Sequence, residues 1–227
     1  MTTECETRQD RAVCLRRGLV IALILFLIFL GFTFAVKHVD RAAVGFGGET
    51  IGLSHLNASV QKTFPFEQSC YKITQLLGYF CLMLAGANAV ISLLDLIRAK
   101  KLSNMTKRYL VTMFFYAVVV LFYALFEVIV INNRPIAAEA SYPSSHTVLA
   151  LCVFYSEFVL LRYCAKRNAF WAMILRIACI VAMVAMAVLR LLSGVHWFTD
   201  IIGAVLLSSA LIVAYKSIVD YADPYTP

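Results

Sequence analysis

The sequence predicts an all-α, polytopic membrane protein with six transmembrane helices. Of its 227 residues, 62% are hydrophobic and 15% are charged, whereas a soluble domain is about half apolar and a quarter charged. The apolar residues gather in six runs separated by short polar links, and a helix of about 20 such residues crosses a bilayer. The formal net charge of +7 comes largely from basic clusters in these links. That pattern is typical of membrane topology, so no nucleic-acid partner is expected.

The predicted spans follow the apolar runs in order. They are residues 18–36, 73–94, 109–131, 147–161, 170–189 and 198–215. Together they form one membrane domain, residues 18–217, between an N-terminal tail (1–17) and a C-terminal tail (218–227). The first run is too long for the core of a signal peptide and lacks a small-residue cleavage site, so it is expected to stay as an anchor.

Residues 37–71 form the longest polar segment. Within it, Ile51, Leu56, Val60 and Phe64 recur at near-helical spacing. A short amphipathic helix on the bilayer surface fits this spacing, and a plain loop fits it equally well.

The distribution of basic residues predicts the orientation. With six spans, both termini lie on one side. That side carries thirteen Lys and Arg residues against six on the other, leaving out Arg176 within the fifth span. The excess places both termini in the cytoplasm. It also brings the links 132–146 and 190–197 together on the outer face. The short loops favour a bacterial cytoplasmic membrane.

The link before the last span contains the polar stretch that best indicates function. It runs from Arg190 through His196 to Asp200, with Ser193-Gly194 interrupting the helical pattern. His196 and Asp200 stand one helical turn apart on one face. A carboxylate at that spacing can fix the imidazole tautomer and leave the other ring nitrogen as a nucleophile or base. An interfacial His beside a helix-capping Asp is the alternative interpretation.

The outer link 132–146 carries groups that can bind an anion. It contains Arg134-Pro135 and then Pro143-Ser144-Ser145-His146, immediately before an apolar run. Backbone N–H groups at a helix N-terminus favour an anion. An Arg side chain matches phosphate through its planar fork of donors. His suits covalent catalysis and proton transfer near pH 7.

These three segments together resemble the signature of the type 2 phosphatidic acid phosphatase superfamily, in its integral membrane, lipid phosphate phosphatase branch. The segments are Arg134-Pro135, Pro143-Ser-Ser-His146 and Arg190-x5-His196-x3-Asp200. The resemblance covers residues from about 109 to 217 well and the first two spans only by layout. It implies an outer-face hydrolase for a phospholipid phosphate or an isoprenoid pyrophosphate.

The resemblance also implies a role for each motif residue. His196 would attack phosphorus to give a phosphohistidine, with Asp200 orienting it. His146 would protonate the leaving alkoxide and then activate water. Phosphate oxygens would be held by Arg134, Arg190 and the backbone of Ser144, Ser145 and His146. Arg and His carry this chemistry, so neither a metal nor another cofactor is expected.

One departure from the family pattern concerns the substrate site. The pattern has a Lys seven residues before the first Arg, where this chain has Glu127. The change removes one phosphate contact and adds a carboxylate. Two alternatives to a hydrolase stay open. One is a phosphotransferase, which shares the phosphohistidine step but passes the phosphoryl group to another lipid or sugar. The other is a weakly catalytic lipid-binding relative, because Glu127 replaces the Lys of the pattern.

Two charged residues lie deep inside predicted spans. Glu157 and Arg176 are about 16 and 21 Å from the outer ends of their spans by helix rise. Charged groups inside a bilayer usually find partners, so the two are expected to pair.

Overall fold

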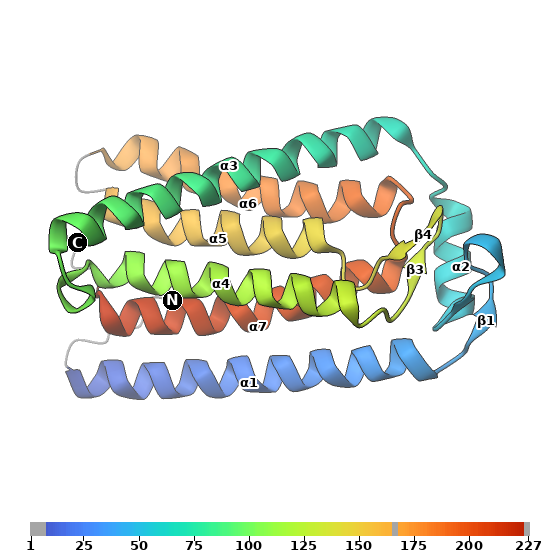
Figure 1. The fold of residues 1–227 in the computed structure, drawn as a ribbon, viewed down its shortest axis with the longest axis horizontal. Helices are drawn as coiled ribbons and strands as arrows, with labels where there is room; N and C mark the ends of the chain where they lie inside the picture. Colours follow the sequence, from blue (N-terminus) through green and yellow to red (C-terminus); the bar gives the residue numbers. More distant parts are fainter. Residues whose placement is uncertain (1–7, 165–167, 225–227) are drawn as a thin grey trace.

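The computed structural model describes residues 8–164 and 168–224. Six long helices form a bundle, and their axes run along its length (Figure 1). They are α1 (Arg8–His38), α3 (Gln68–Ala99), α4 (Lys107–Val128), α5 (Ser145–Cys164), α6 (Ala169–Leu192) and α7 (Phe198–Ala222). Each is long and apolar enough to cross a membrane. The predicted all-α fold with six spans is thus confirmed, and the chain is a multi-pass membrane protein.

The smaller elements lie mostly at one end of the bundle (Figure 1). A two-stranded pair, β1 (Ala42–Ala43) with β2 (Thr50–Ile51), encloses the 3-10 turn η1 (Phe46–Gly48), and α2 (Ser54–Thr63) follows. A second antiparallel pair, β3 (Asn133–Arg134) with β4 (Ala137–Ala140), joins α4 to α5. At the other end, η2 (Leu102–Asn104) links α3 to α4. We call the end that carries α2 and the two strand pairs the site end.

The helices differ in extent from the predicted spans. Helix α1 already begins at Arg8 and α7 continues to Ala222. Charged residues are compatible with helical backbone, so helix continues into the predicted tails beyond the apolar runs. Helix α4 ends at Val128 rather than near residue 131, because the chain there turns into β3.

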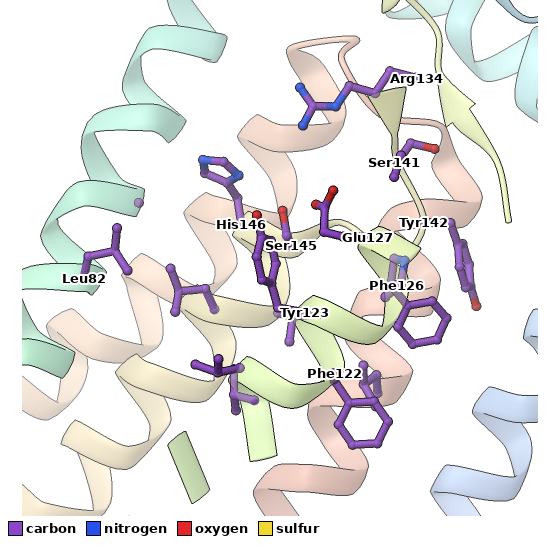
Figure 2. Close-up of a pocket in the computed structure, with 18 of the residues that line it drawn as sticks. Leu82, Phe122, Tyr123, Phe126, Glu127, Arg134, Ser141, Tyr142, Ser145 and His146 are labelled. Atoms are coloured by element: carbon purple, nitrogen blue, oxygen red, sulfur yellow. The ribbon is translucent and has the colours of Figure 1, made fainter. Parts of the chain in front are cut away.

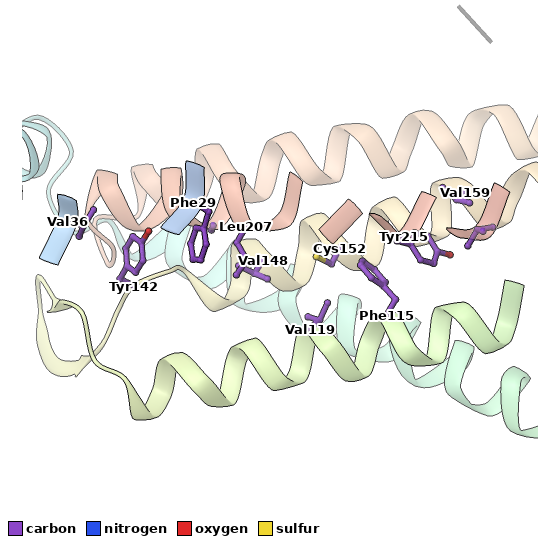
Figure 3. Packing of buried hydrophobic residues seen from close by; sticks show 12 residues of the cluster. Phe29, Val36, Phe115, Val119, Tyr142, Val148, Cys152, Val159, Leu207 and Tyr215 are labelled. Carbon is purple, nitrogen blue, oxygen red and sulfur yellow. The ribbon is translucent and has the colours of Figure 1, made fainter. Parts of the chain in front are cut away.

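Helices α5 and α7 are the central pair of the bundle. They are the most buried of the six long helices. Helix α5 packs against α3, α4, α6 and α7, while α1 lies along α7. Apolar side chains from several helices fill the space between them, among them Phe29, Val119, Val148, Leu207 and Tyr215 (Figure 3). The first turns of α5 and α7 carry His146 and Asp200, so the motif residues are built on the most constrained part of the fold.

The outer segment 37–71 contains α2. The face of α2 turned toward the protein is polar, because Ser54 and Asn57 are buried while Leu56 is 45% exposed. Asn57 donates to Thr199 Oγ1 at 3.0 Å and accepts from the Thr199 N–H at 3.2 Å. These contacts fasten α2 to the first turn of α7. Contact of its apolar face with the bilayer surface stays a prediction.

Candidate active site

The two outer links meet at the site end, where α5 and α7 begin and α6 ends (Figure 1). The Ser144 N–H donates to the Asp200 carbonyl at 3.1 Å. The Trp197 indole N–H donates to the Asn133 carbonyl at 2.7 Å. Segments separated by more than 50 residues in the sequence are therefore joined by direct hydrogen bonds.

His196 and Asp200 form a buried pair. Their Nδ1 and Oδ2 atoms lie 3.3 Å apart, and the two residues are 2% and 0% exposed. The same Oδ2 accepts the Trp197 N–H at 2.9 Å, so this carboxylate both caps α7 and contacts the imidazole. A carboxylate facing Nδ1 favours the tautomer that carries its proton there. Nε2 then holds the lone pair, and it has no hydrogen-bond partner among the described residues.

The surroundings keep His196 uncharged. Burial is the main cause that lowers the pKa of His196 well below its ordinary value, and the positive charges of Arg190 and Arg134 lower it further. Desolvation and like charge both disfavour the imidazolium. The lone pair on Nε2 is therefore available at neutral pH without prior loss of a proton.

This arrangement predicts how His196 titrates. In micelles at low ionic strength, the ¹⁵N resonances of His196 should show the neutral form throughout about pH 5 to 8, where an unperturbed His would titrate. Because its folded-state pKa is depressed, protonation sets in only below that range. Arg134→Gln removes one positive charge, so protonation should then begin at a higher pH. A His196 titration near pH 6.5 in the wild type would contradict this electrostatic account.

Arg190 connects His146 to α3. Its Nη2 donates to His146 Nδ1 at 3.2 Å and its Nη1 donates to Thr74 Oγ1 at 3.0 Å. Arg190 is fully buried, with its guanidinium 5.5 Å from the centre of the Tyr71 ring. A guanidinium only donates, so Nδ1 of His146 accepts. The ring lies against Gly78, where a Cβ would come within 2.9 Å of His146 Cδ2. Gly78 thus leaves the space that the imidazole occupies.

The turn between α6 and α7 is held by the outer segment. Gly194 adopts a positive φ of 64°, and a Cβ there would lie 2.6 Å from the backbone carbonyl carbon of Pro65. The Gln61 side-chain amide donates to the Gly194 carbonyl at 2.9 Å. The Glu67 N–H donates to the Ser193 carbonyl at 3.0 Å. These contacts fix the short link that carries His196.

A cavity of about 420 Å³ opens beside this site between α3, α4 and the start of α5 (Figure 2). Its polar end is formed by Glu127, Arg134, Ser145 and His146. Its remaining walls are mainly apolar or aromatic: Gly78, Tyr79, Leu82, Val119, Val120, Phe122, Tyr123, Phe126, Ala140, Ser141, Tyr142, Pro143, Val148, Leu149 and Leu207. Arg190, His196 and Asp200 do not line the cavity. Of the two predicted histidines, His146 faces the open space and His196 is buried outside it.

Three predicted phosphate-binding residues already have protein partners, and one of them is Arg190, which contacts His146 and Thr74. Arg134 pairs with Glu139 across the β3–β4 hairpin, with Nη1 and Oε2 3.1 Å apart. The Ser144 N–H is taken by Asp200, and the Ser144 hydroxyl lies 3.0 Å from Thr147 Oγ1. Ser145 lines the cavity. Phosphate binding by this group stays a prediction. It requires Arg134, Arg190 and the Ser144 N–H to exchange their present partners for the phosphate.

The residues that support the site were not identified from the sequence. Thr74, Gly78, Asn57 and Gln61 lie in α3 and the outer segment, outside the motif segments. Thr74 and Gly78 are four residues apart, on one face of a strongly apolar helix, and this pair of small residues was the available signal. In the described ranges, no three His, Cys, Asp or Glu side chains are close enough to share a metal ion.

The fold and the site define an integral membrane protein with His and Arg side chains gathered at one end of a helical bundle. Residues 76–224 match the family model of the PAP2 superfamily. This match covers well over half of the chain, so the protein belongs to the PAP2 superfamily and has its phosphatase membrane fold. The resemblance found in the motif residues is thereby confirmed.

A solved structure shares the fold. It is described as the first transmembrane PAP2 type phosphatidylglycerolphosphate phosphatase from Bacillus subtilis, and it superposes with a TM-score of 0.57. The sequence identity is 19%, over 86% of this chain and 93% of that chain. A comparison with curated proteins gave no match.

Proposed function

We propose that this protein removes phosphate from a lipid phosphate or lipid pyrophosphate through a phosphohistidine on His196. The observation that carries the proposal is the buried His196–Asp200 pair, whose contact at Nδ1 leaves Nε2 without a partner in the described part of the chain. The membership in the PAP2 superfamily supports the same chemistry.

The proposed reaction has two steps. In the first, His196 Nε2 attacks phosphorus, the ester P–O bond breaks, and protonated His146 gives its proton to the leaving oxygen. In the second, His146 takes a proton from water, which attacks phosphorus and breaks the P–N bond. Arg134 and Arg190 hold the phosphoryl oxygens, together with the helix-start backbone of Ser144 and Ser145. Positioning and charge stabilisation supply most of the acceleration in such a transfer.

Substrate binding prepares His146 as the acid. Arg190 donates to His146 Nδ1, which leaves no room for a proton on that nitrogen. When phosphate draws the guanidinium toward its own oxygens, Nδ1 becomes free to be protonated. The dianionic ligand also stabilises the imidazolium beside it. Phosphate binding and protonation of His146 Nδ1 are therefore coupled through Arg190.

The lining of the cavity supports the proposal that the substrate is a lipid. Its polar end lies beside His146 and Arg134, and apolar side chains of α3 and α4 line the rest, such as Leu82 and Phe122 (Figure 2). A phosphate at the polar end leaves a hydrocarbon chain against these walls, where burial of apolar surface is favourable. A free sugar phosphate would gain no such contact.

Phosphate release from lipids tests the function. The purified protein in micelles should release inorganic phosphate from at least one of phosphatidic acid, phosphatidylglycerophosphate and a polyprenyl pyrophosphate. Release should persist in excess chelator, because Arg and His side chains supply the positive charge. Activity that vanished with chelator and returned with magnesium would contradict the mechanism. Transfer to a lipid or sugar without release of phosphate would indicate a phosphotransferase.

We further propose that both termini lie in the cytoplasm of a bacterial cell and that the site end faces outward. In a background without other cysteines, Ala138→Cys in the β3–β4 hairpin should react with an impermeant thiol reagent added to intact cells. Ser103→Cys in η2 should react only after lysis. Both positions are exposed, so access alone decides the outcome. The opposite pattern would place the site on the cytoplasmic side.

A further inference from the structure

We propose that Glu127 makes this site selective for lipid phosphates that carry an ammonium group next to the phosphate. The inference rests on the proposed function and narrows its substrate class. The Glu127 carboxylate lies at the polar end of the cavity.

Glu127 lies in the last turn of α4 and lines the cavity together with Arg134, Ser145 and His146. Figure 2 shows its carboxylate extending into the space between His146 and Arg134. The carboxylate makes no hydrogen bond or ion pair with any residue in the described ranges, and Arg134 pairs with Glu139 instead. Glu127 is thus an unpartnered anion within the substrate cavity.

This position is unfavourable for a carboxylate unless a cation joins it. The C-terminal end of a helix carries partial negative charge, which repels an anion in its last turn. A bound phosphate adds further negative charge nearby, and like charges at such distances in a partly desolvated site disfavour binding. For a purely anionic lipid phosphate, Glu127 therefore opposes the contribution of Arg134 and Arg190.

An ammonium on the substrate reverses the sign of this effect. With the phosphate between Arg134 and His146, a neighbouring ammonium meets Glu127 on the α4 wall, and each charge of the ligand faces its opposite. A charge-assisted hydrogen bond of this kind corresponds to about tenfold to a hundredfold in affinity. The matching ligand is a single- or double-chain amphiphile with a free amine close to its phosphate monoester.

The test compares two single-chain lipid phosphates that differ only in an amine or a hydroxyl next to the phosphate-bearing carbon. Phosphate release gives kcat/KM for each, in excess chelator. The wild type should prefer the amine by about tenfold to a hundredfold. Glu127→Gln should lower kcat/KM for the amine and raise it for the hydroxyl compound. Glu127→Lys should invert the preference. A merely structural role of Glu127 would move both substrates in the same direction.

Matched phosphonates of the two compounds give a binding readout that does not need turnover. Their dissociation constants should show the same preference in wild type and its loss in Glu127→Gln. Glu49→Gln, which changes a carboxylate of the outer segment that does not line the cavity, should leave the preference intact. Equal binding of both phosphonates by wild type would overturn the inference, even if phosphate is released from both substrates. Preference in binding without any phosphate release would instead uphold it and refute the proposed hydrolase.

A divalent cation held by Glu127 would give a different result. Wild-type activity toward the hydroxyl compound would then rise with added calcium or magnesium, the amine would bring no advantage, and Glu127→Gln would abolish the response to metal. That outcome would also overturn the proposal.

Discussion

Replacing His196 by alanine is expected to reduce phosphate release by roughly 10⁴- to 10⁶-fold, as loss of the nucleophile does in enzymes with a covalent intermediate. The substitution removes Nε2, the protein atom that bonds to phosphorus in the proposed scheme. The measurement is kcat/KM for a lipid phosphate, with thermal unfolding followed in parallel because the side chain is buried.

A second histidine provides the matched control. His55 lies in α2 with its side chain 92% exposed, and its Nδ1 is 2.5 Å from Asp40 Oδ1. It reproduces the His–Asp contact outside the site. His55→Ala should leave activity within about twofold, since surface pairs contribute little. Comparable losses in the two variants would show that the effect does not arise from chemistry at His196.

Replacing Asp200 by asparagine is expected to lower kcat by about 10⁴-fold while the fold is retained. In the wild type, Asp200 Oδ2 both accepts the Trp197 N–H and faces His196 Nδ1. An amide NH₂ in that position requires Nδ1 to accept, and the Trp197 N–H loses this one acceptor while the other hydrogen bonds of α7 remain. The imidazole proton moves to Nε2 and removes the lone pair that attacks phosphorus.

The exposed pair of His55 and Asp40 again supplies the control. Asp40→Asn alters the equivalent contact with His55 and should leave kcat unchanged, apart from a small loss of stability. The KM of the Asp200→Asn enzyme should change little, because Asp200 does not line the cavity. A kcat near that of the wild type in Asp200→Asn would contradict the tautomer argument.

The spans and the motif segments could be predicted because each depends on local pattern. Six apolar runs of membrane length indicate six helices whatever their packing. The spacing of His196 and Asp200 places both on one helix face before any tertiary contact is considered. Their 3.3 Å contact is therefore a local property of the chain.

The contacts between distant segments could not be read in the same way. Thr74 and Gly78 act on Arg190 and His146 from α3, and nothing in the sequence gives the rotation of that helix. Helix rotation also determines which residues contact Glu157 and Arg176, and the prediction that these two residues pair was wrong. Asn88 donates to Glu157, while the Arg176 guanidinium lies 4.2 Å from the centre of the Phe158 ring.

The outer segment shows the same limit. The spacing of its apolar residues left a helix and a loop equally open, and the structure has α2 at 54–63. Its inward face is formed by Asn57 and Ser54 rather than by the apolar residues. The hydrogen bonds between Asn57 and Thr199, which are 142 residues apart in the sequence, determine which face of α2 turns inward. The spacing of residues within a ten-residue helix carries no information about such a distant partner.

A covalent phosphoenzyme at His196 is the central step of the proposed reaction, and rapid-quench trapping tests it directly. With a ³²P-labelled aryl phosphate, which needs no acid to expel its leaving group, wild type should form an acid-labile, base-stable phosphoprotein. His146→Ala should accumulate more of it, because water lacks its base, while its rate with an alkyl phosphate falls by about 10²- to 10⁴-fold. His196→Ala should form none. Label in His196→Ala but not in His146→Ala would exchange the two roles, and an active wild type with no label at all would contradict the covalent mechanism.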